Sequence, residues 1–151
     1  QKLYEEPCSM FVAGFIGSPQ MNFLDAVCQV EDDDVYLTIG EMKLRLPETK
    51  AERLKAGRYD GKTVVLGIRP EDLHDESEFV EKSQGTALKA KIRGYEMMGT
   101  EVFLYFEYEG TNMTARVAPK TAARTGDIVK FALDADKIHV FDKDTEKTIT
   151  N

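Results

Sequence analysis

The sequence predicts a mainly β fold of short antiparallel strands closed into one or more barrels, with an N-terminal helix and one short helical insertion. Three observations lead to this fold class. After Pro19, apolar and polar residues alternate in short runs, which is the period of a half-buried strand. Short polar turns separate these runs, and Gly94 and Gly99 stand where a bulge or a sharp bend is expected. Many short strands of this kind are typical of an OB-like barrel.

The N-terminal helix is expected over residues 7–16, PCSMFVAGFI. Pro7 suits the first helical position, where its missing N–H costs nothing, and Gly17 suits the position after the last turn. Pro19 then prevents the helix from continuing. Because the helix has almost no polar side chain, neighbouring elements must bury it on several sides. The side chains expected to pack on the barrel are Phe11, Val12, Phe15 and Ile16.

A first lobe of strands is expected after this helix. An acidic turn and Gly40 separate three β-rich runs, which predicts a three-strand meander. Gly57 is the expected end of a short helix, and Pro70 breaks the strand that follows it. The expected elements are strands at 23–30, 35–39 and 42–46, a helix at 49–57, and a turn and strand over 59–68.

An acidic segment, residues 71–84, is the expected boundary between two lobes of about 20–75 and 84–151. It carries six carboxylates and only Lys82 to offset them, so it is either a solvated connector or a docking surface. Short polar turns separate the strands of the second lobe. These strands are expected at 86–98, 101–108, 112–117, 127–133, 137–141 and 147–150.

Composition and charge exclude several classes of protein. Of the 151 residues, 42% are apolar and 31% are charged, which is ordinary for a globular domain and argues against disorder. The net charge of −7 disfavours binding to nucleic acid or to an anionic membrane surface. The opening stretch is too short to span a bilayer and lacks the features of a signal peptide. Cys8 and Cys28 lack metal-ligand spacing and are expected to be reduced, buried thiols.

Residues for catalysis are not apparent in the sequence. There is no phosphate-binding loop, and His74 and His139 are far apart, so neither a metal cluster nor a catalytic triad is expected. His139 is expected to point away from the core of its strand. Two groups of basic residues are either charged faces or docking sites for an oxyanion or a protein. The first lies between residues 43 and 62, and the second consists of Arg116, Lys120, Arg124 and Lys130.

Four motifs occur in a characteristic order: FVAGFIGSPQMNFL (11–24), LGIRPEDL (66–73), IRGYEMMGTEVFLYF (92–106) and DKIHVFDKDT (136–145). In this order the chain resembles the C-terminal region of ATP-binding subunits of carbohydrate-import ABC transporters, of the maltose, multiple-sugar and glycerol-3-phosphate type. The resemblance implies a linker helix over 1–19, which joins an ATPase domain outside this chain, and a regulatory transport-associated OB (TOBE) domain over 20–151.

The same resemblance implies a non-catalytic role. ATP and magnesium would bind only to the ATPase domain, so no cofactor, metal or catalytic residue is expected here. The implied partners are that ATPase domain, a second copy of the chain, membrane permease subunits and a cytosolic regulatory protein, but no nucleic acid. The implied location is cytoplasmic, at the inner face of the cell membrane. An oxyanion sensor of the molybdate type, or a nucleic-acid-binding OB protein, is the alternative.

The motifs also indicate residues for fold or interface integrity. The guanidinium of Arg69 is suited to hold a carboxylate or backbone carbonyls where the strand ends. The region 92–102 is expected to contribute to contact between two regulatory domains. The fold or interface residues are Arg69, Pro70, Glu71, Gly94, Glu96, Gly99 and Glu101, and the linker residues are Phe11, Val12, Phe15, Ile16, Gly17 and Pro19.

Overall fold

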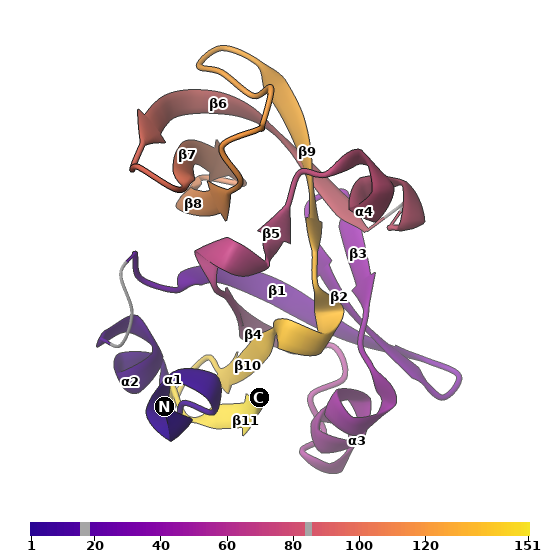
Figure 1. Ribbon diagram of the computed structural model, residues 1–151. Helices are drawn as coiled ribbons and strands as arrows, with labels where there is room; N and C mark the ends of the chain where they lie inside the picture. The colour runs from indigo at the N-terminus through magenta and orange to yellow at the C-terminus, as the bar shows by residue number, and fades with distance from the viewer. Residues whose placement is uncertain (16–18, 84–85) are drawn as a thin grey trace.

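The computed structural model describes residues 1–15, 19–83 and 86–151 and contains two antiparallel sheets (Figure 1). The helices are α1 (Lys2–Glu5), α2 (Met10–Phe15), α3 (Glu48–Ala56) and α4 (Ser77–Lys82), with short 3-10 turns η1 (Pro70–Asp72) and η2 (Ala135–Lys137). The strands are β1 (Asn22–Glu31), β2 (Asp34–Ile39), β3 (Met42–Arg45), β4 (Thr63–Ile68), β5 (Leu73–His74), β6 (Ala87–Met97), β7 (Val102–Tyr108), β8 (Thr111–Val117), β9 (Ile128–Leu133), β10 (His139–Asp142) and β11 (Thr148–Thr150).

The predicted fold class, a mainly β chain of short antiparallel strands, is confirmed. The first sheet has the order β11-β10-β4-β1-β2-β3 and the second the order β5-β9-β6-β7-β8. β10 and β11 come from the end of the chain but pair with β4 of the first sheet, so hydrogen bonding crosses between the two expected lobes. The expected boundaries of the two lobes therefore stay a prediction. The two sheets do not follow these boundaries, because the first sheet contains strands from both ends of the chain.

The main core lies between the sheets and follows from the predicted alternation. In β1, Leu24, Ala26 and Cys28 are buried, while the residues between them are exposed. The same pattern in β7 turns Phe106 inward, where its ring stacks on Phe131 with centroids 4.7 Å apart. Because inward residues come from both sheets, each sheet covers the apolar face of the other.

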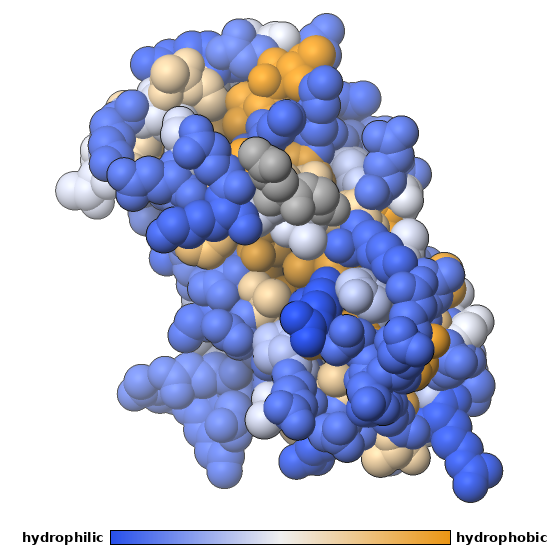
Figure 2. Space-filling view, turned by 90° about the vertical axis from the view of Figure 1, so that its right-hand side faces the viewer, coloured by the Kyte–Doolittle hydropathy of each residue, from blue (hydrophilic) through white to orange (hydrophobic). Residues whose placement is uncertain are grey.

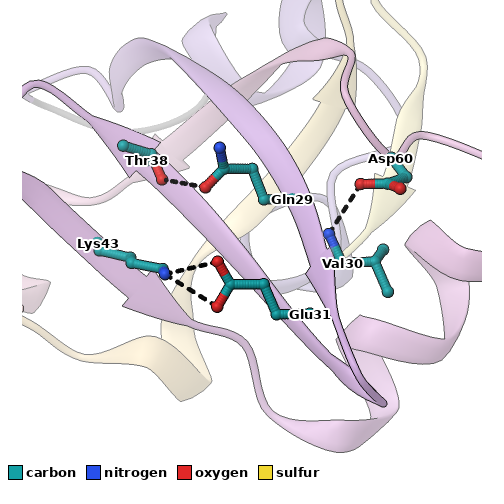
Figure 3. Close-up of polar contacts among 6 residues, drawn as sticks. All are labelled: Gln29, Val30, Glu31, Thr38, Lys43 and Asp60. Carbon is teal, nitrogen blue, oxygen red and sulfur yellow. Dashed lines mark hydrogen bonds and ion pairs between the residues drawn. The ribbon is translucent and has the colours of Figure 1, made fainter.

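The outward face of β1–β3 contains two cations of the first basic group, Lys43 and Arg45. Lys43 Nζ lies 2.8 Å from a carboxylate oxygen of Glu31, and Figure 3 shows this pair beside the hydrogen bond from Thr38 to Gln29. Arg45 pairs with Asp34 at 2.9 Å, and Lys55 pairs with Glu52 at 3.1 Å. These three cations are neutralised locally, whereas Lys50 of the same group is buried and donates to Asn151 O.

The opening helix differs from the prediction of residues 7–16. Two short helices, α1 and α2, take its place, and α2 begins only at Met10. Pro7 lies between them, and its carbonyl accepts a hydrogen bond from Thr148 Oγ1 at 2.7 Å. Ser9 forms an isolated antiparallel bridge with Lys147. The backbone before Met10 is extended because it pairs with the turn between β10 and β11.

The acidic segment 71–84 is more structured than a connector. Leu73 is 1% exposed and pairs with Leu133 as part of β5, and helix α4 follows. The strand β5 thus ties the start of this segment into the second sheet. The remainder exposes its carboxylates, because no residue of α4 is buried.

Expectations for four single residues have mixed outcomes. The bulge expected at Gly94 is confirmed by a shift of register between Ile92 and Gly94. Cys28 is buried as predicted, but Cys8 is exposed, because it lies at the surface beside the β10–β11 turn. The outward orientation predicted for His139 is wrong. Its side chain is 6% exposed because β10 lies inside the sheet, between β4 and β11, and beside the N-terminal helices.

Two buried side chains join the sheets. Asn22 in β1 donates to Thr114 O at 2.9 Å and to Ile68 O at 3.2 Å, and its own oxygen accepts from Thr114 N at 2.9 Å. The Tyr108 hydroxyl donates to Ile39 O at 2.9 Å. Sequence patterns do not reveal such bonds, since they depend on how the sheets pack.

Gly67 is expected to be the least tolerant glycine of the core. A Cβ at this position would lie 2.5 Å from Met21 Sδ and 2.8 Å from Phe141 Cε2. Gly67→Ala is therefore expected to lower the free energy of unfolding by about 1–3 kcal/mol in urea denaturation, because core side chains must shift. Gly14→Ala is the matched control. Its Cβ would meet Phe23 at an ordinary 3.4 Å, so an equal loss there would contradict this explanation.

Candidate functional site

The candidate site is the contact between residues 1–15, which we term the N-terminal segment, and the end of β4. Arg69 is 3% exposed there, and its Nη2 donates to Tyr4 O at 2.8 Å. Its Nη1 lies 3.4 Å from Ala13 O. Tyr4 and Ala13 belong to α1 and α2, whose last carbonyls lack partners within the helix. One guanidinium therefore binds the ends of both helices, which agrees with the expectation that Arg69 holds backbone carbonyls.

Tyr4 is bound to the body by its ring and hydroxyl as well as by its carbonyl. The guanidinium of Arg69 lies 3.8 Å from the ring centroid, in cation–π geometry. The hydroxyl donates to the carboxylate of Glu71. Burial, together with the hydrogen bond to Glu71, raises the pKa of Tyr4 to about 12, so the phenol remains a donor at neutral pH. Tyr4 thus anchors α1 to the body through three contacts.

A chain of charges continues from Glu71 to the second sheet. Arg116, in β8, has Nη2 3.6 Å from Glu71 Oε2 and Nε 3.2 Å from Glu101 Oε2. Glu101 lies in the turn between β6 and β7. The structure therefore links the predicted residues Glu71 and Glu101 through Arg116. The sequence placed Arg116 only in a basic group, and Tyr4 had no predicted role.

Three more of the predicted residues, Gly94, Glu96 and Gly99, lie on the β6–β7 hairpin, as Glu101 does, whereas Pro70 is buried at the start of η1. Glu96 accepts a hydrogen bond from Tyr105 Oη at 2.7 Å across the hairpin. Gly99 has a φ of +74°, the left-handed conformation that glycine adopts without strain. Beside it, Met97 and Met98 are 51% and 48% exposed. The hairpin tip therefore presents apolar surface around residues 96–99.

The linker residues are placed differently from the expectation. Phe11 is 76% exposed, so most of its surface does not pack on the barrel, and Val12 is half-buried. Ala13 is fully buried instead, in a small cluster that includes Met21 and Phe141. Because α2 turns its small residue inward, its backbone approaches the sheet closely. Pro19 is half-buried, whereas Ile16, Gly17 and the side chain of Phe15 lie outside the described residues.

A cleft of about 520 Å³ lies between the N-terminal segment and the body. His139 lines it, and its Nδ1 is 3.0 Å from Asn151 Oδ1. Burial lowers the pKa of His139 to about 4, so the imidazole is neutral at pH 7. Within the described ranges, no group of three or more His, Cys, Asp or Glu side chains could hold a metal ion. The residues lining the cleft are Tyr4, Glu5, Glu6, Arg69, Glu71, Asp72, Asp136, Lys137, His139 and Asn151.

Asp72 is expected to make stability depend on pH. Burial, with the nearby Glu71 and Asp134, raises the pKa of Asp72 from 3.8 to about 6. The folded state therefore binds this proton more tightly than the unfolded chain. The resulting stabilisation is complete below pH 3.8 and is lost as the pH rises through 6. Asp72→Asn should be more stable than the wild type at pH 8 by about 1–3 kcal/mol, with the difference vanishing near pH 4.

Urea denaturation of both proteins between pH 4 and pH 8 checks this prediction. The lowered pKa of His139 has the opposite effect on stability, which falls as the pH drops from 6.5 toward 4. Because His139 is the same in both proteins, the difference between them reports on Asp72 alone. A stability difference that does not change with pH would exclude Asp72 as the titrating group.

Family models match almost the whole described body. Residues 17–73 match the MalK OB fold domain, and residues 66–141 match the TOBE domain. The chain belongs to the TOBE domain family. The two matched ranges of this TOBE domain overlap at 66–73, the stretch that contains Arg69 and Glu71. The contacts of the N-terminal segment thus lie where the two models meet.

Two relatives of this TOBE domain are named as ATP-binding proteins of sugar import. The oligosaccharides import ATP-binding protein MsmX of Bacillus subtilis is 40% identical over 97% of this chain. The trehalose/maltose import ATP-binding protein MalK of Thermococcus litoralis is 37% identical over 98% of it. The chain spans 39% of the length of each of these relatives. These relatives confirm the resemblance drawn from the four motifs.

A solved structure shares the fold at much lower identity. The cytoplasmic molybdate-binding protein ModG, with molybdate bound, aligns with a TM-score of 0.59 and 15% identity. The alignment covers 79% of this TOBE domain and 94% of the ModG chain. At this identity the likeness concerns the fold alone. In the described part of the TOBE domain, no helix is long and apolar enough to cross a membrane.

Proposed function

We propose that the chain is the regulatory domain of an ATP-binding subunit of a carbohydrate-import ABC transporter, and that it couples assembly of the ATPase dimer to transport. The observation that carries this proposal is the similarity of nearly the whole chain to 39% of MsmX and MalK, which are import ATP-binding proteins by name. The proposed role is non-catalytic. ATP and magnesium belong to the ATPase domain of the longer protein, and this chain binds no cofactor.

The N-terminal segment is the proposed joint to that ATPase domain. Arg69 fixes α1 and α2 through their carbonyls, so motion of the segment is transmitted to the body instead of being lost in a flexible linker. The ion pairs of Arg116 extend this contact from Glu71 to Glu101. A joint fixed in this way lets the regulatory domain move as one body with its neighbour.

The β6–β7 hairpin is the proposed contact with a second copy of the chain. Its tip exposes Met97 and Met98, and apolar surface of this kind is typical of protein interfaces. The further proposed partners are membrane permease subunits and a cytosolic regulatory protein, and nucleic acid is not among them. The proposed location is cytoplasmic, bound to the inner membrane face through the transporter.

Dimer mass in solution tests the hairpin contact. Light scattering of the wild-type chain is expected to show a dimer that Glu96→Lys combined with Glu101→Lys dissociates. Glu96→Lys alone should weaken the dimer without breaking the ion pair of Glu101 with Arg116. Glu48→Lys with Glu81→Lys changes the net charge equally at exposed sites elsewhere and should leave the mass unchanged. An unchanged mass in the hairpin variants would reject this interface.

Transport by the full-length subunit tests the coupling. Arg69→Met in that protein is expected to preserve ATP hydrolysis by the isolated subunit while reducing sugar uptake by the assembled transporter several-fold. The isolated chain should not hydrolyse ATP. Uptake unaffected by Arg69→Met would contradict the role of the N-terminal segment as a joint.

A further inference from the structure

A second group of cations lies together on the outer surface of the second sheet. In the pairing of β6 with β9, Lys89 stands opposite Lys130, and Lys91 stands opposite Ile128. All four side chains are exposed, and Ile128 is 64% exposed. Lys120, in the loop before β9, borders the same region. We call Lys89, Lys91, Lys120, Ile128 and Lys130 the basic face.

The lysines of the basic face are not neutralised. Over residues 1–15, 19–83 and 86–151, no ion pair or hydrogen bond joins any of the four ammonium groups to another side chain. Lys43 and Arg45 of β3, in contrast, are paired with carboxylates. Like charges directly opposite each other destabilise a sheet. In a chain of net charge −7, these four cations form a local positive patch that can attract an anionic partner.

The need to protect a sheet edge from pairing with other chains does not explain all the lysines of the basic face. Lysine on an edge strand prevents pairing with other chains, and this explanation suffices for Lys130, since β9 is unpaired along part of one side. Lys89 and Lys91, however, are in β6, which lies between β9 and β7 in the interior of the sheet. Their positions therefore require another reason.

A groove of about 870 Å³ separates the start of β9 from α4. Ala123, Ile128 and Val129 line one side of it, and Val80 of α4 lines the other. On this side of the molecule, Figure 2 shows an apolar area in the upper part with hydrophilic residues around it. β5 pairs with β9 only at Ala132 and Leu133. The backbone at 128–130 thus has no strand beside it on the groove side within the described chain.

We propose that the basic face and this groove bind an extended, acidic segment of another protein. An added strand would pair with the open edge at 128–130, in the way that peptides extend exposed sheets. Its carboxylates would point to the face of Ile128 and Lys130, toward Lys89, Lys91 and Lys130, and its apolar side chains would point to the other face, toward Val129 and Val80 in the groove. A peptide in which acidic and apolar residues alternate suits this arrangement, because successive side chains of a strand point to opposite faces.

The groove is less suited to a nucleic acid. Asp75, Glu76 and Glu78 form its opposite wall and would repel a continuous phosphate backbone. Phe131, next to Lys130, is buried, and Tyr95 already contacts the Arg124 guanidinium at 4.6 Å, so neither ring is a free platform for base stacking. A peptide can instead place its carboxylates on the lysine side alone.

Titration with a short peptide that alternates glutamate with leucine tests the proposal. In amide NMR spectra of the 151-residue chain, the shifts are expected to move at residues 89, 91 and 128–130, with binding that weakens as salt rises. Lys89→Glu combined with Lys130→Glu should weaken binding at least about tenfold. Both sites are exposed, so the variant should retain the wild-type melting temperature.

Three controls decide between this and other partners. Lys2→Glu with Lys147→Glu alters the net charge equally at exposed, distant sites and should leave binding within about twofold. A peptide with lysine in place of glutamate should not bind. The proposal is overturned if the acidic peptide moves no amide of the basic face. It is equally overturned if a single-stranded oligonucleotide or an anionic lipid vesicle binds there more tightly, or if dilution shows that a second copy of the chain occupies the face.

Discussion

Arg69→Met is expected to release the N-terminal segment from the body while the two sheets remain folded. Arg69 is buried and makes charge-assisted hydrogen bonds to Tyr4 O and Ala13 O, as well as a cation–π contact with the Tyr4 ring. Charge-assisted bonds contribute more than neutral ones, and their loss leaves helix-end carbonyls without donors. The expected loss is about 3 kcal/mol in the free energy that holds the segment in place.

Hydrogen exchange measures this prediction directly. Amides of residues 10–15 should lose protection by about two orders of magnitude in Arg69→Met, while those of β6–β8 keep theirs. Arg69→Lys is the matched control, since it retains the charge but cannot bind both carbonyls at once. We expect it to lie between the wild type and Arg69→Met. Equal loss of protection throughout the chain would mean that Arg69 stabilises the whole fold and does not act as a local anchor.

Asn22→Leu is expected to have a comparable effect on the whole domain. Asn22 makes three hydrogen bonds that join β1 to β4 and β8, and it is 6% exposed. A leucine of similar size would leave the Thr114 N–H and two carbonyls facing an apolar side chain. The expected cost is about 3 kcal/mol in the free energy of unfolding, because each buried group without a partner is unfavourable.

Urea denaturation of Asn22→Leu and of Tyr108→Phe compares how much each variant lowers the free energy of unfolding. Tyr108→Phe removes the other bond between the sheets, a single hydroxyl to Ile39 O, and should cost only about 1 kcal/mol. If Asn22→Leu is no more destabilising than Tyr108→Phe, the bonds of Asn22 do not hold the sheets together.

The positions of most strands along the chain could be predicted because each depends on neighbouring residues. The alternation of β1 and β7 and the bulge at Gly94 were all expected from local pattern. The placement of Cys8 and His139 was not, since it depends on β10 and β11 lying between β4 and the N-terminal helices. Burial of a residue is set by what covers it, and that element can come from anywhere in the chain.

In the candidate site, too, local features could be predicted from the sequence and contacts between distant residues could not. The motif LGIRPEDL indicated Arg69, because a guanidinium at a strand end can hold a carboxylate or backbone carbonyls. The motif did not indicate that Tyr4 and Ala13 supply those carbonyls, nor that Arg116 joins Glu71 to Glu101. These contacts link residues that are far apart in the chain. No local pattern in a single sequence encodes them.

The pairing of β4 with β10 has a consequence for the order of folding. Gly67 pairs with His139 and Leu66 with Val140, so the first sheet stays incomplete until the end of the chain is available. During translation, the apolar edge of β4 would remain open while the residues between are made, and an open edge invites pairing with other chains. Such distant pairing also slows folding. This domain is therefore expected to fold after its synthesis is complete, with protection by chaperones until then.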